Sequence, residues 1–504
     1  MTRRGAAFGL AFVLAAGTLV TGARLGAQSF WIDEAITLVP VTQAQNTADL
    51  VARVRVIDTQ PPASHAVLFF LRGLLPHDEF GWRLPSLLAV EAGVLLLALL
   101  GGRLFGAAGL FWTGLCAQIS PYLLFYAMEA RNYALWFLAV ALAGYAMTRC
   151  LQAIAAGRPP AEVAIAAALW AAANALGLWT HLFHLFALLA QGIVLAGLVL
   201  VLRPPRPIVR RGALVSAASL GASLLLFLPW IVTIAQGEHG VARGVGWTRQ
   251  LHYGGFLYFP FALLFGFSLG PDLRELHEEP ARGLLLAHPV PLLLAAVAIA
   301  GLAAGLAVSL RGARRAGDPP AAVLFLLVPA AGFAGPVVYA LARDFPLVPR
   351  HLMFLWPLVP LLQAHLASRR PRLQAVVAAV VCLQAVAAFN LLFDPAYAKD
   401  DERGAVRWAE ARSGARPVIL GDAAPLYAEK GLGLMKALTE PKSDRVLGSG
   451  ATDLWLVDNR PWEDPQGNIR EKTGQAAERL GLLPAESEAR FRGLVLRHWS
   501  KETR

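Results

Sequence analysis

Residues 182–207 read LFHLFALLAQGIVLAGLVLVLRPPRP, and this stretch decides the class of fold. The part from 182 to 202 contains no Asp, Glu, Lys or Arg and is long enough to cross a bilayer as a helix. A basic, proline-rich segment at 203–207 follows directly. It predicts a stiff connector on the cytoplasmic side, where Lys and Arg accumulate. The sequence therefore predicts a chain that spans a membrane.

The same pattern recurs along the chain. Of 504 residues, 56% are hydrophobic and only 16% are charged, whereas a soluble domain has about a quarter charged. The composition predicts an all-α polytopic membrane protein with about 11 transmembrane helices. The windows long enough to span a bilayer lie near 5–25, 84–105, 107–126, 130–149, 161–180, 182–202, 212–235, 288–310, 321–342, 351–367 and 373–393.

The first window ends in LGAQ, which resembles a signal-peptide cleavage site. Because its apolar run is long and further spans follow, we interpret 5–25 as an uncleaved first span. With Arg3 and Arg4 cytoplasmic, every basic loop cluster falls on the inside. Counting the window 251–270 as a full span would send 311–315 outside, so we expect 251–270 to be re-entrant or juxtamembrane.

This topology places two large segments outside: a first outer loop of about 26–83, and everything after Asp394. The carboxy-terminal part has short apolar runs, PVIL at 417–420, LWLV at 454–457 and LVL at 494–496, which alternate with helix-like stretches. We therefore expect a transmembrane domain over 1–394 and a small extracytoplasmic α/β domain over 395–504.

The charge, the cysteines and the motifs exclude several function classes. The net charge of +11 reflects cytoplasmic loops that face anionic lipid, so nucleic acid is not expected as a partner. The three cysteines, Cys116, Cys150 and Cys382, fall in or at the ends of apolar runs and predict no disulfide framework. The chain contains no P-loop, no dinucleotide fingerprint and no DxD triplet.

Charged residues at the predicted outer ends of the spans are the candidate site. Asp33 and Glu34 lie in QSFWIDEAITL, residues 28–38, just outside the first span. Arg83, Arg131 and Arg350 also lie at outer span ends, against the positive-inside trend. An arginine there needs an anion, which is a neighbouring carboxylate or the phosphate of a lipid substrate held bidentately.

An outward carboxylate near cationic groups suits the transfer of a group from a lipid phosphate to a hydroxyl. The carboxylate takes the proton of the acceptor, and the cations stabilise the charge that builds on the departing phosphate. A metal ion is left open by these residues. His181 and His184, three residues apart, are read either as a metal pair or as interfacial histidines.

The order of the motifs resembles a known family. WIDEA, QPP, WRLPS, SPYLLFYAMEARNYAL, WTH, PRHLMFLWPLVPLL and AYAKDDERGAVRWAEA follow one another at span ends over nearly the whole chain. This order resembles the GT-C class of membrane glycosyltransferases. Within that class it is most similar to the superfamily of protein mannosyltransferases, aminoarabinose transferases and RgtA-B-C-D-like enzymes.

The resemblance implies roles for particular residues. Asp33 corresponds to the catalytic carboxylate, with Glu34 as its neighbour, and Arg83, Arg131 and Arg350 correspond to positions expected to bind the donor phosphate. Tyr133, His181 and Lys399 are candidate substrate-binding residues. The alternative for Tyr133 is a place in the aromatic belt at the membrane interface, and the alternative for Lys399 is a charged first helical turn capped by Asp400 or Asp401. The family usually has His or Lys before the Pro-Pro motif, whereas this chain has Gln60, which puts a phosphate role there in doubt.

The function implied is an inverting glycosyltransferase of the bacterial cytoplasmic (inner) membrane, a hexosyl- or pentosyltransferase. Its partners are a polyprenyl-phosphate-linked sugar donor, membrane lipid, and a glycan, lipid or protein acceptor on the outer face. No cofactor is certain, and a divalent metal ion stays open. The alternatives are a transporter or flippase of lipid-linked sugars, which predicts ionisable residues such as Glu91 near the bilayer midplane, and a non-catalytic scaffold.

Overall fold

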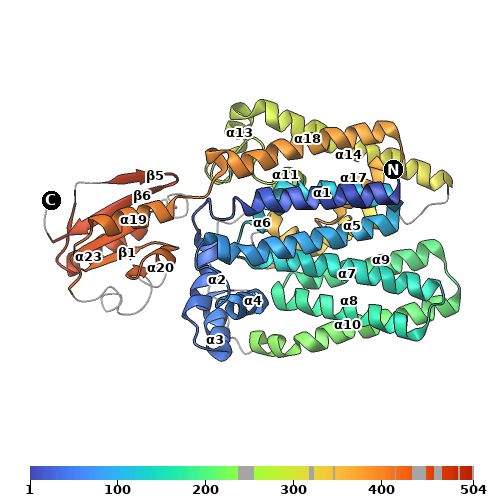
Figure 1. The fold of residues 1–504 in the computed structure, drawn as a ribbon, viewed down its shortest axis with the longest axis horizontal. Helices are drawn as coiled ribbons and strands as arrows, with labels where there is room; N and C mark the ends of the chain where they lie inside the picture. Colours follow the sequence, from blue (N-terminus) through green and yellow to red (C-terminus); the bar gives the residue numbers. More distant parts are fainter. Residues whose placement is uncertain are drawn as a thin grey trace. The chain divides into compact units, whose positions relative to one another are not determined.

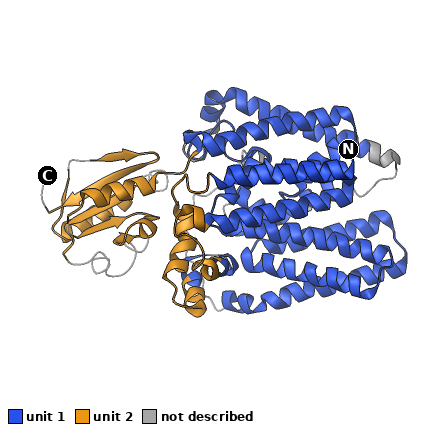
Figure 2. Cartoon of the chain, in the orientation of Figure 1, with its two compact units in different colours: residues 1–23, 54–67, 83–397 blue, residues 24–53, 68–82, 398–504 orange. Residues whose placement is uncertain are grey.

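A computed structural model of the chain describes residues 1–58, 60–235, 255–316, 323–343, 345, 347–414, 416–433, 450–458, 468–485 and 488–501 (Figure 1). These residues form two compact units (Figure 2). Unit 1 comprises residues 1–23, 54–67 and 83–397, and unit 2 comprises residues 24–53, 68–82 and 398–504. The segment that contains Asp33 thus belongs to the same compact unit as the carboxy-terminal residues.

Long apolar helices dominate the structure, as the composition predicts. Within the described residues, nine helices are long and apolar enough to cross a membrane, so the chain is a multi-pass membrane protein. They are α1 (Arg3–Gly22), α5 (Glu79–Gln118), α7 (Asn132–Ala155), α8 (Pro160–Thr180), α9 (His184–Leu202), α10 (Arg206–Ala235), the part Pro289–Arg311 of α14 (Pro289–Ala316), the part Leu324–Arg343 of η2 (Val323–Leu327) and α16 (Val328–Arg343), and α18 (Pro371–Phe393).

Shorter elements connect these helices. They are α2 (Ile32–Gln43), α3 (Thr47–Ile57), α4 (Ala63–Leu71), α6 (Pro121–Ala127), α11 (Gly255–Phe265), α12 (Glu275–Glu278), α13 (Ala281–Ala287), η3 (Pro349–Leu352), α17 (Leu358–Ala367) and η4 (Pro395–Tyr397). Within the window 251–270, the described residues form α11 and a turn after it, and the eleven residues of α11 are too few to cross a bilayer.

Helix α5 contains two predicted spans, 84–105 and the start of 107–126. Its backbone leaves the helical region at Gly106, where φ is +75°, a conformation that glycine adopts without strain. The two arms fold back on each other and lie close together at Gly101. A Cβ added there would overlap Thr113 Oγ1 and lie 2.8 Å from the carbonyl oxygen of Gly109. Small residues therefore let the arms pack closely.

Two predicted spans are not continuous helices. The window 107–126 breaks before Pro121, which lacks an N–H, and Ser120 caps the new helix α6 by accepting a hydrogen bond from Leu123 N at 3.4 Å. The window 351–367 is divided into η3 and the ten-residue helix α17, which begins after Pro357. Hydropathy alone does not show such breaks, because it averages over prolines.

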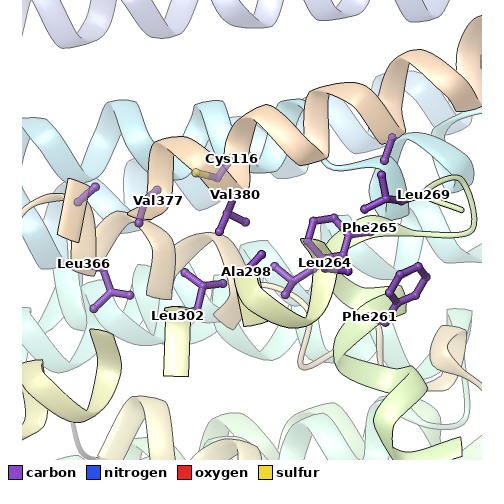
Figure 3. Packing of buried hydrophobic residues seen from close by; sticks show 13 residues of the cluster. Cys116, Phe261, Leu264, Phe265, Leu269, Ala298, Leu302, Leu366, Val377 and Val380 are labelled. Carbon is purple, nitrogen blue, oxygen red and sulfur yellow. The ribbon is translucent and has the colours of Figure 1, made fainter. Parts of the chain in front are cut away.

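One core of unit 1 forms where α11 packs between α14 and α18 (Figure 3). Phe265 of α11 is fully buried, Ala298 and Leu302 come from α14, and Val377 and Val380 come from α18. Phe261, Leu264 and Phe265 of α11 are thus buried in protein, which is where a short non-spanning helix is tolerated at membrane depth.

Glu91 is an acid inside the membrane-spanning part of α5. Gln118 Nε2, from the other arm of α5, donates a hydrogen bond to Glu91 Oε1 at 2.7 Å. Gly17 of α1 provides space for this pair, because a Cβ there would overlap the Gln118 side chain. Glu91 therefore joins neighbouring helices, as a polar residue in a membrane bundle is expected to do.

Many arginines lie near one end of the unit 1 helices. Arg103 Nη1 donates to Gln152 Oε1 at 3.1 Å, which places the Gly106 turn beside the end of α7. Phe105 also contacts His365 at 5.2 Å between ring centroids, and a 2.7 Å hydrogen bond joins His365 to Ser309 of α14. The arginines at or next to the helix ends gathered there are Arg103, Arg149, Arg158, Arg203, Arg206, Arg311, Arg369 and Arg370.

Unit 2 contains a mixed sheet with the order β2-β1-β3-β6-β4, and β5 pairs with β6. Strand β3 runs parallel to β1, with Ile419 opposite Trp455, and antiparallel to β6, with Trp455 opposite His498. The strands are β1 (Pro417–Leu420), β2 (Gly431–Leu432), β3 (Asp453–Asp458), β4 (Leu483–Pro484), β5 (Ala489–Phe491) and β6 (Leu494–Ser500). The predicted strands 417–420, 454–457 and 494–496 are all present.

Helices cover both faces of this sheet. Alternate residues of each strand point to opposite faces, so Ile419 and Trp455 pack with α19 (Glu402–Arg412) and α20 (Ala424–Tyr427). Leu420 and Leu456 pack with α23 (Asn468–Arg479) on the other face. The carboxy-terminal residues thus form the α/β fold that the strand pattern predicts, and α2 packs against α20 within the same unit.

Candidate active site

Asp33 and Glu34 lie in the first turn of α2. Both side chains are buried, with 5% and 0% of their surfaces exposed. Helix α2 has no side-chain cap at Trp31, so its amino-terminal N–H groups leave a partial positive charge that acidic side chains in this turn complement. The helix start therefore stabilises the two carboxylates in a place where few charges would be tolerated.

Glu34 forms an ion pair with Lys399. The distance from Lys399 Nζ to Glu34 Oε2 is 3.2 Å, and Nζ also lies 5.4 Å from the centre of the Trp31 ring. The backbone N–H of Lys399 donates to Gln28 Oε1 at 3.2 Å. Lys399 thus contacts three residues of the segment that carries the acid pair. Its contact with substrate stays a prediction.

Other contacts in unit 2 join the same parts of the sequence. Arg403 Nη1 lies 3.0 Å from Glu79 Oε1, and the hydroxyl of Tyr427 donates to the same oxygen at 2.8 Å. Tyr427 accepts a hydrogen bond from Phe30 N at 2.5 Å. Asp401 caps α19 by accepting from Gly404 N at 3.0 Å, which is the capping role that an aspartate ahead of a helix favours.

In unit 1, Arg131 binds the carboxylate of Asp58, which is not among the predicted site residues. Arg131 Nη1 lies 3.0 Å from Asp58 Oδ2, and His65 Nε2 lies 3.5 Å from the same oxygen. All three side chains are buried. Burial alone raises the pKa of Asp58, but Arg131, His65 and a hydrogen bond from Gln60 N together lower that pKa below its ordinary value. Asp58 is therefore a charged partner for Arg131.

Gln60 has a structural contact at the position where the family usually has His or Lys. Its Oε1 accepts a hydrogen bond from Leu182 N at 3.2 Å, which ties the segment before Pro61 and Pro62 to the turn between α8 and α9. This contact uses the amide oxygen that a basic residue would lack. Gln60 thus supports the backbone next to His181.

His181 and His184 have different environments. His184 Nδ1 accepts from Trp136 Nε1 at 3.0 Å, and a 3.0 Å hydrogen bond joins Nε2 to Asn174 Oδ1, so both ring nitrogens are occupied. This arrangement leaves no nitrogen of His184 for a metal shared with His181. In the described part of the chain, no group of three or more His, Cys, Asp or Glu residues could hold a metal ion.

The predicted substrate residue Tyr133 belongs to a run of tyrosines. Its ring centre lies 4.9 Å from that of Tyr126, which lies 5.1 Å from that of Tyr122. The hydroxyl of Tyr122 donates to the carbonyl oxygen of Pro349 at 3.0 Å, next to Arg350 in η3. The aromatic residues of α6 and α7 thus meet the segment that carries Arg350.

The predicted residues fall into two sets. Asp33, Glu34 and Lys399 belong to unit 2, where the ion pair joins the last two. The other set belongs to unit 1: Arg83, Arg131, Tyr133, His181 and Arg350. Within that set, the charges of Arg131 and Arg350 both act on His181, and Arg83 is 1% exposed in the amino-terminal part of α5.

Asp58 and His65 are the residues that the sequence reasoning missed. Both lie in DTQPPASH, residues 58–65, of which the motif order uses only QPP. The signal available in the sequence was an acid and a histidine that flank two prolines. The sequence does not show that this segment faces an arginine from another part of the chain. Only the fold shows that Arg131 is that arginine.

No family model matches the chain, and no curated protein matches its sequence. Solved structures do match. The structure of ArnT from Cupriavidus metallidurans in the apo state has a TM-score of 0.59 and 15% identity, and the alignment covers 98% of both chains. The structure of the same protein bound to undecaprenyl phosphate has a TM-score of 0.53 and 15% identity, with 97% of both chains covered. The chain therefore has the GT-C fold that its motif order predicts.

Proposed function

We propose that this chain is an inverting glycosyltransferase that moves a sugar from a polyprenyl phosphate to an acceptor hydroxyl. The observation that carries the proposal is the acid pair at the start of α2. Lys399 neutralises Glu34 at 3.2 Å, and the adjacent buried carboxylate of Asp33 is the proposed base. The fold supports the proposal, because a structure with the same fold is described as bound to undecaprenyl phosphate.

The proposed reaction is a direct displacement. The acceptor oxygen attacks the anomeric carbon of the sugar while the bond from that carbon to the phosphate oxygen breaks. The proton of the acceptor passes to Asp33, and the electron pair of the broken bond remains on the released phosphate. Because attack occurs opposite to the leaving group, the product has the inverted anomeric configuration.

The arginines of unit 1 are proposed to stabilise the released phosphate. Arg83, Arg131 and Arg350 carry permanent charges, and a guanidinium binds two phosphate oxygens at once. Negative charge on the phosphate increases as the bond to the sugar breaks, so these cations stabilise the transition state more than the bound donor. Tyr133 and Lys399 remain proposed contacts of the substrate.

The reaction is proposed to take place on the outer face of the bacterial cytoplasmic membrane. The arginine-rich helix ends of unit 1 suit the cytoplasmic side. Arg131 and His181 lie at the start of α7 and the end of α8, which is the opposite end of these helices. The proposed acceptor is a glycan, lipid or protein, and the sugar is a hexose or a pentose.

The test is the substitution Asp33→Asn, which keeps the shape of the side chain and removes the base. We expect the rate of sugar transfer to fall by at least about 100-fold, with the protein level in membranes unchanged. The measurement supplies membranes with a panel of radiolabelled polyprenyl-phosphate sugars and records which label leaves the lipid. The panel also identifies the sugar.

Asp49→Asn is the matched control. Asp49 lies in the same unit, in α3, and pairs with Arg53 on a partly exposed helix face. It loses a negative charge without touching the acid pair, so its transfer rate should equal that of the wild type. Turnover at the wild-type rate in the Asp33→Asn protein would remove Asp33 as the base.

A further inference from the structure

The side chain of His181 is held in one position. His181 ends α8 and is fully buried. Its ring lies flat on the indole of Trp136, with 3.9 Å between ring centres and 11° between the planes. This stacking, the edge contact of Phe183 and the tilted contact of Tyr133 surround the imidazole and hold it in place. The direction of its two nitrogens is therefore a property of the fold.

The backbone also sets the position of the proton on this ring. The N–H of Phe183 donates to Nδ1 of His181 at 3.1 Å, so Nδ1 carries a lone pair and the proton lies on Nε2. Burial, with His351 and the arginines 131 and 350, lowers the pKa of His181 well below its ordinary value. The ring is thus neutral, and Nε2–H is a fixed donor.

Among the residues that the structure describes, that donor has no acceptor. Nε2 of His181 is buried and makes no hydrogen bond within the part of the chain that the structure describes. A buried donor that has lost water without gaining an acceptor is costly, and proteins rarely keep one without a reason. His184 shows the contrast, because both of its nitrogens are hydrogen-bonded inside the same bundle. A ligand that brings an acceptor to Nε2 would explain the arrangement.

The surrounding charge selects an anionic acceptor. The positive charges of Arg131 and Arg350 both act on the His181 ring. His351, whose ring centre lies 6.2 Å away, also has its Nδ1 facing a backbone N–H, that of Val348 at 3.3 Å. A neutral His351 therefore also carries its proton on Nε2. Cations and N–H donors gathered in this way favour an oxyanion and disfavour a cation.

We propose that His181 Nε2–H donates a hydrogen bond to a non-bridging phosphate oxygen of the polyprenyl-phosphate substrate. This inference rests on the proposed function and adds a neutral donor to the arginines of that site. The phosphodiester of the donor becomes a phosphomonoester on release and gains negative charge at the oxygen of the broken bond. The hydrogen bond therefore strengthens along the reaction without adding a fourth positive charge.

The test compares two ligands on the purified full-length protein in lipid nanodiscs: a polyprenyl phosphate and the polyprenol of the same length. The dissociation constant of the polyprenol divided by that of the polyprenyl phosphate measures the contribution of the phosphate, because the lipid tail is the same in both ligands. In His181→Asn, the side-chain amide reaches only the position of Nδ1, and the ratio should fall by about 10- to 100-fold, as for one lost hydrogen bond to a charged group. In His181→Gln, whose amide nitrogen reaches the position of Nε2, the ratio should stay within a few-fold of the wild type.

His184→Gln is the matched control, because it alters a buried histidine that is already hydrogen-bonded within the protein. It should lower thermal stability and leave the ratio unchanged. Equal ratios in wild type and His181→Asn would overturn the role of His181 alone, as would an equal loss of phosphate and polyprenol binding. A wild-type protein that does not prefer the phosphate to the polyprenol would overturn the proposed function as well.

Discussion

Arg131 illustrates at the scale of single residues why a cation is found at an unexpected end of a membrane helix. It lies just before α7, buried, with Asp58 as its ion-pair partner at 3.0 Å. The attraction between the two charges offsets the cost of removing them from water, so losing either charge destabilises the fold. Asp58 therefore offsets the cost of burying the Arg131 charge and holds Arg131 in position for the proposed phosphate.

The first prediction concerns this pair. Asp58→Asn should lower the free energy of unfolding by about 3–5 kcal/mol, because Arg131 loses the carboxylate of a buried ion pair. The double substitution Asp58→Asn with Arg131→Met should recover most of that loss. Thermal unfolding of the purified proteins in detergent measures both effects, and additive losses would contradict a direct interaction.

The pH dependence follows from the same pair. The pKa of Asp58 is lower in the folded protein than its ordinary value, so the folded protein binds the proton less readily than the unfolded chain. Its contribution to stability is therefore present above the ordinary pKa and is lost as pH falls through the folded pKa. The stability difference between wild type and Asp58→Asn should narrow below about pH 4. A difference that stays constant there would show that Asp58 is not the titrating group.

At the scale of elements, the hairpin in α5 depends on the absence of side chains. Gly101 faces Gly109 and Thr113 across the two arms, and the chain reverses at Gly106. Glycines let the backbones approach, and dispersion contacts then hold the arms together where lipid offers no hydrophobic driving force. Composition predicts two spans here, and the contacts of these glycines show how they pair.

The second prediction tests that packing. Gly101→Ala places a methyl group on Thr113 Oγ1 and 2.8 Å from the carbonyl oxygen of Gly109, and it should lower the free energy of unfolding by about 1–3 kcal/mol through overpacking. Gly192→Ala in α9 is the control, because nothing lies within 4 Å of its added methyl group. Thermal unfolding of the two variants should separate them, and equal melting temperatures would refute the close approach.

The breaks in two predicted spans show the limit of sequence reasoning about elements. Pro121 and Pro357 are visible in the sequence, yet membrane helices often tolerate proline when neighbours satisfy the freed backbone groups. Whether a proline bends or ends a helix depends on those neighbours. At Ser120, the hydroxyl caps α6, so ending the helix is the stable outcome here.

At the scale of the whole molecule, unit 2 is built from sequence segments far apart in the chain. Glu34 and Lys399 are separated by 365 residues and form a buried ion pair. Arg403 and Glu79 join a further segment to the same unit. The α/β residues thus position the segment that carries the acid pair, in addition to any role in binding an acceptor.

The third prediction separates this positioning role from chemistry. Lys399→Met should lower the free energy of unfolding by about 3–5 kcal/mol, because it leaves the Glu34 charge buried. Adding Glu34→Gln should restore stability. If Lys399 acts only through Glu34, transfer activity should also recover in the double variant, whereas a Lys399 that contacts substrate would leave it inactive. Melting temperature and labelled-sugar release give the two readings.

The sequence by itself determined the class of fold, because apolar windows and basic loops follow from the cost of placing charge and unpaired backbone in lipid. It also determined the α/β elements, since short apolar strand runs alternate with helix-like stretches after Asp394. The motif order pointed to Asp33 and the arginines. Only the tertiary structure decided that Glu34 binds Lys399, that Arg131 binds Asp58, and that His181 presents Nε2–H. Partners in such contacts are distant in the chain, and neither hydropathy nor local propensity encodes which of them meet.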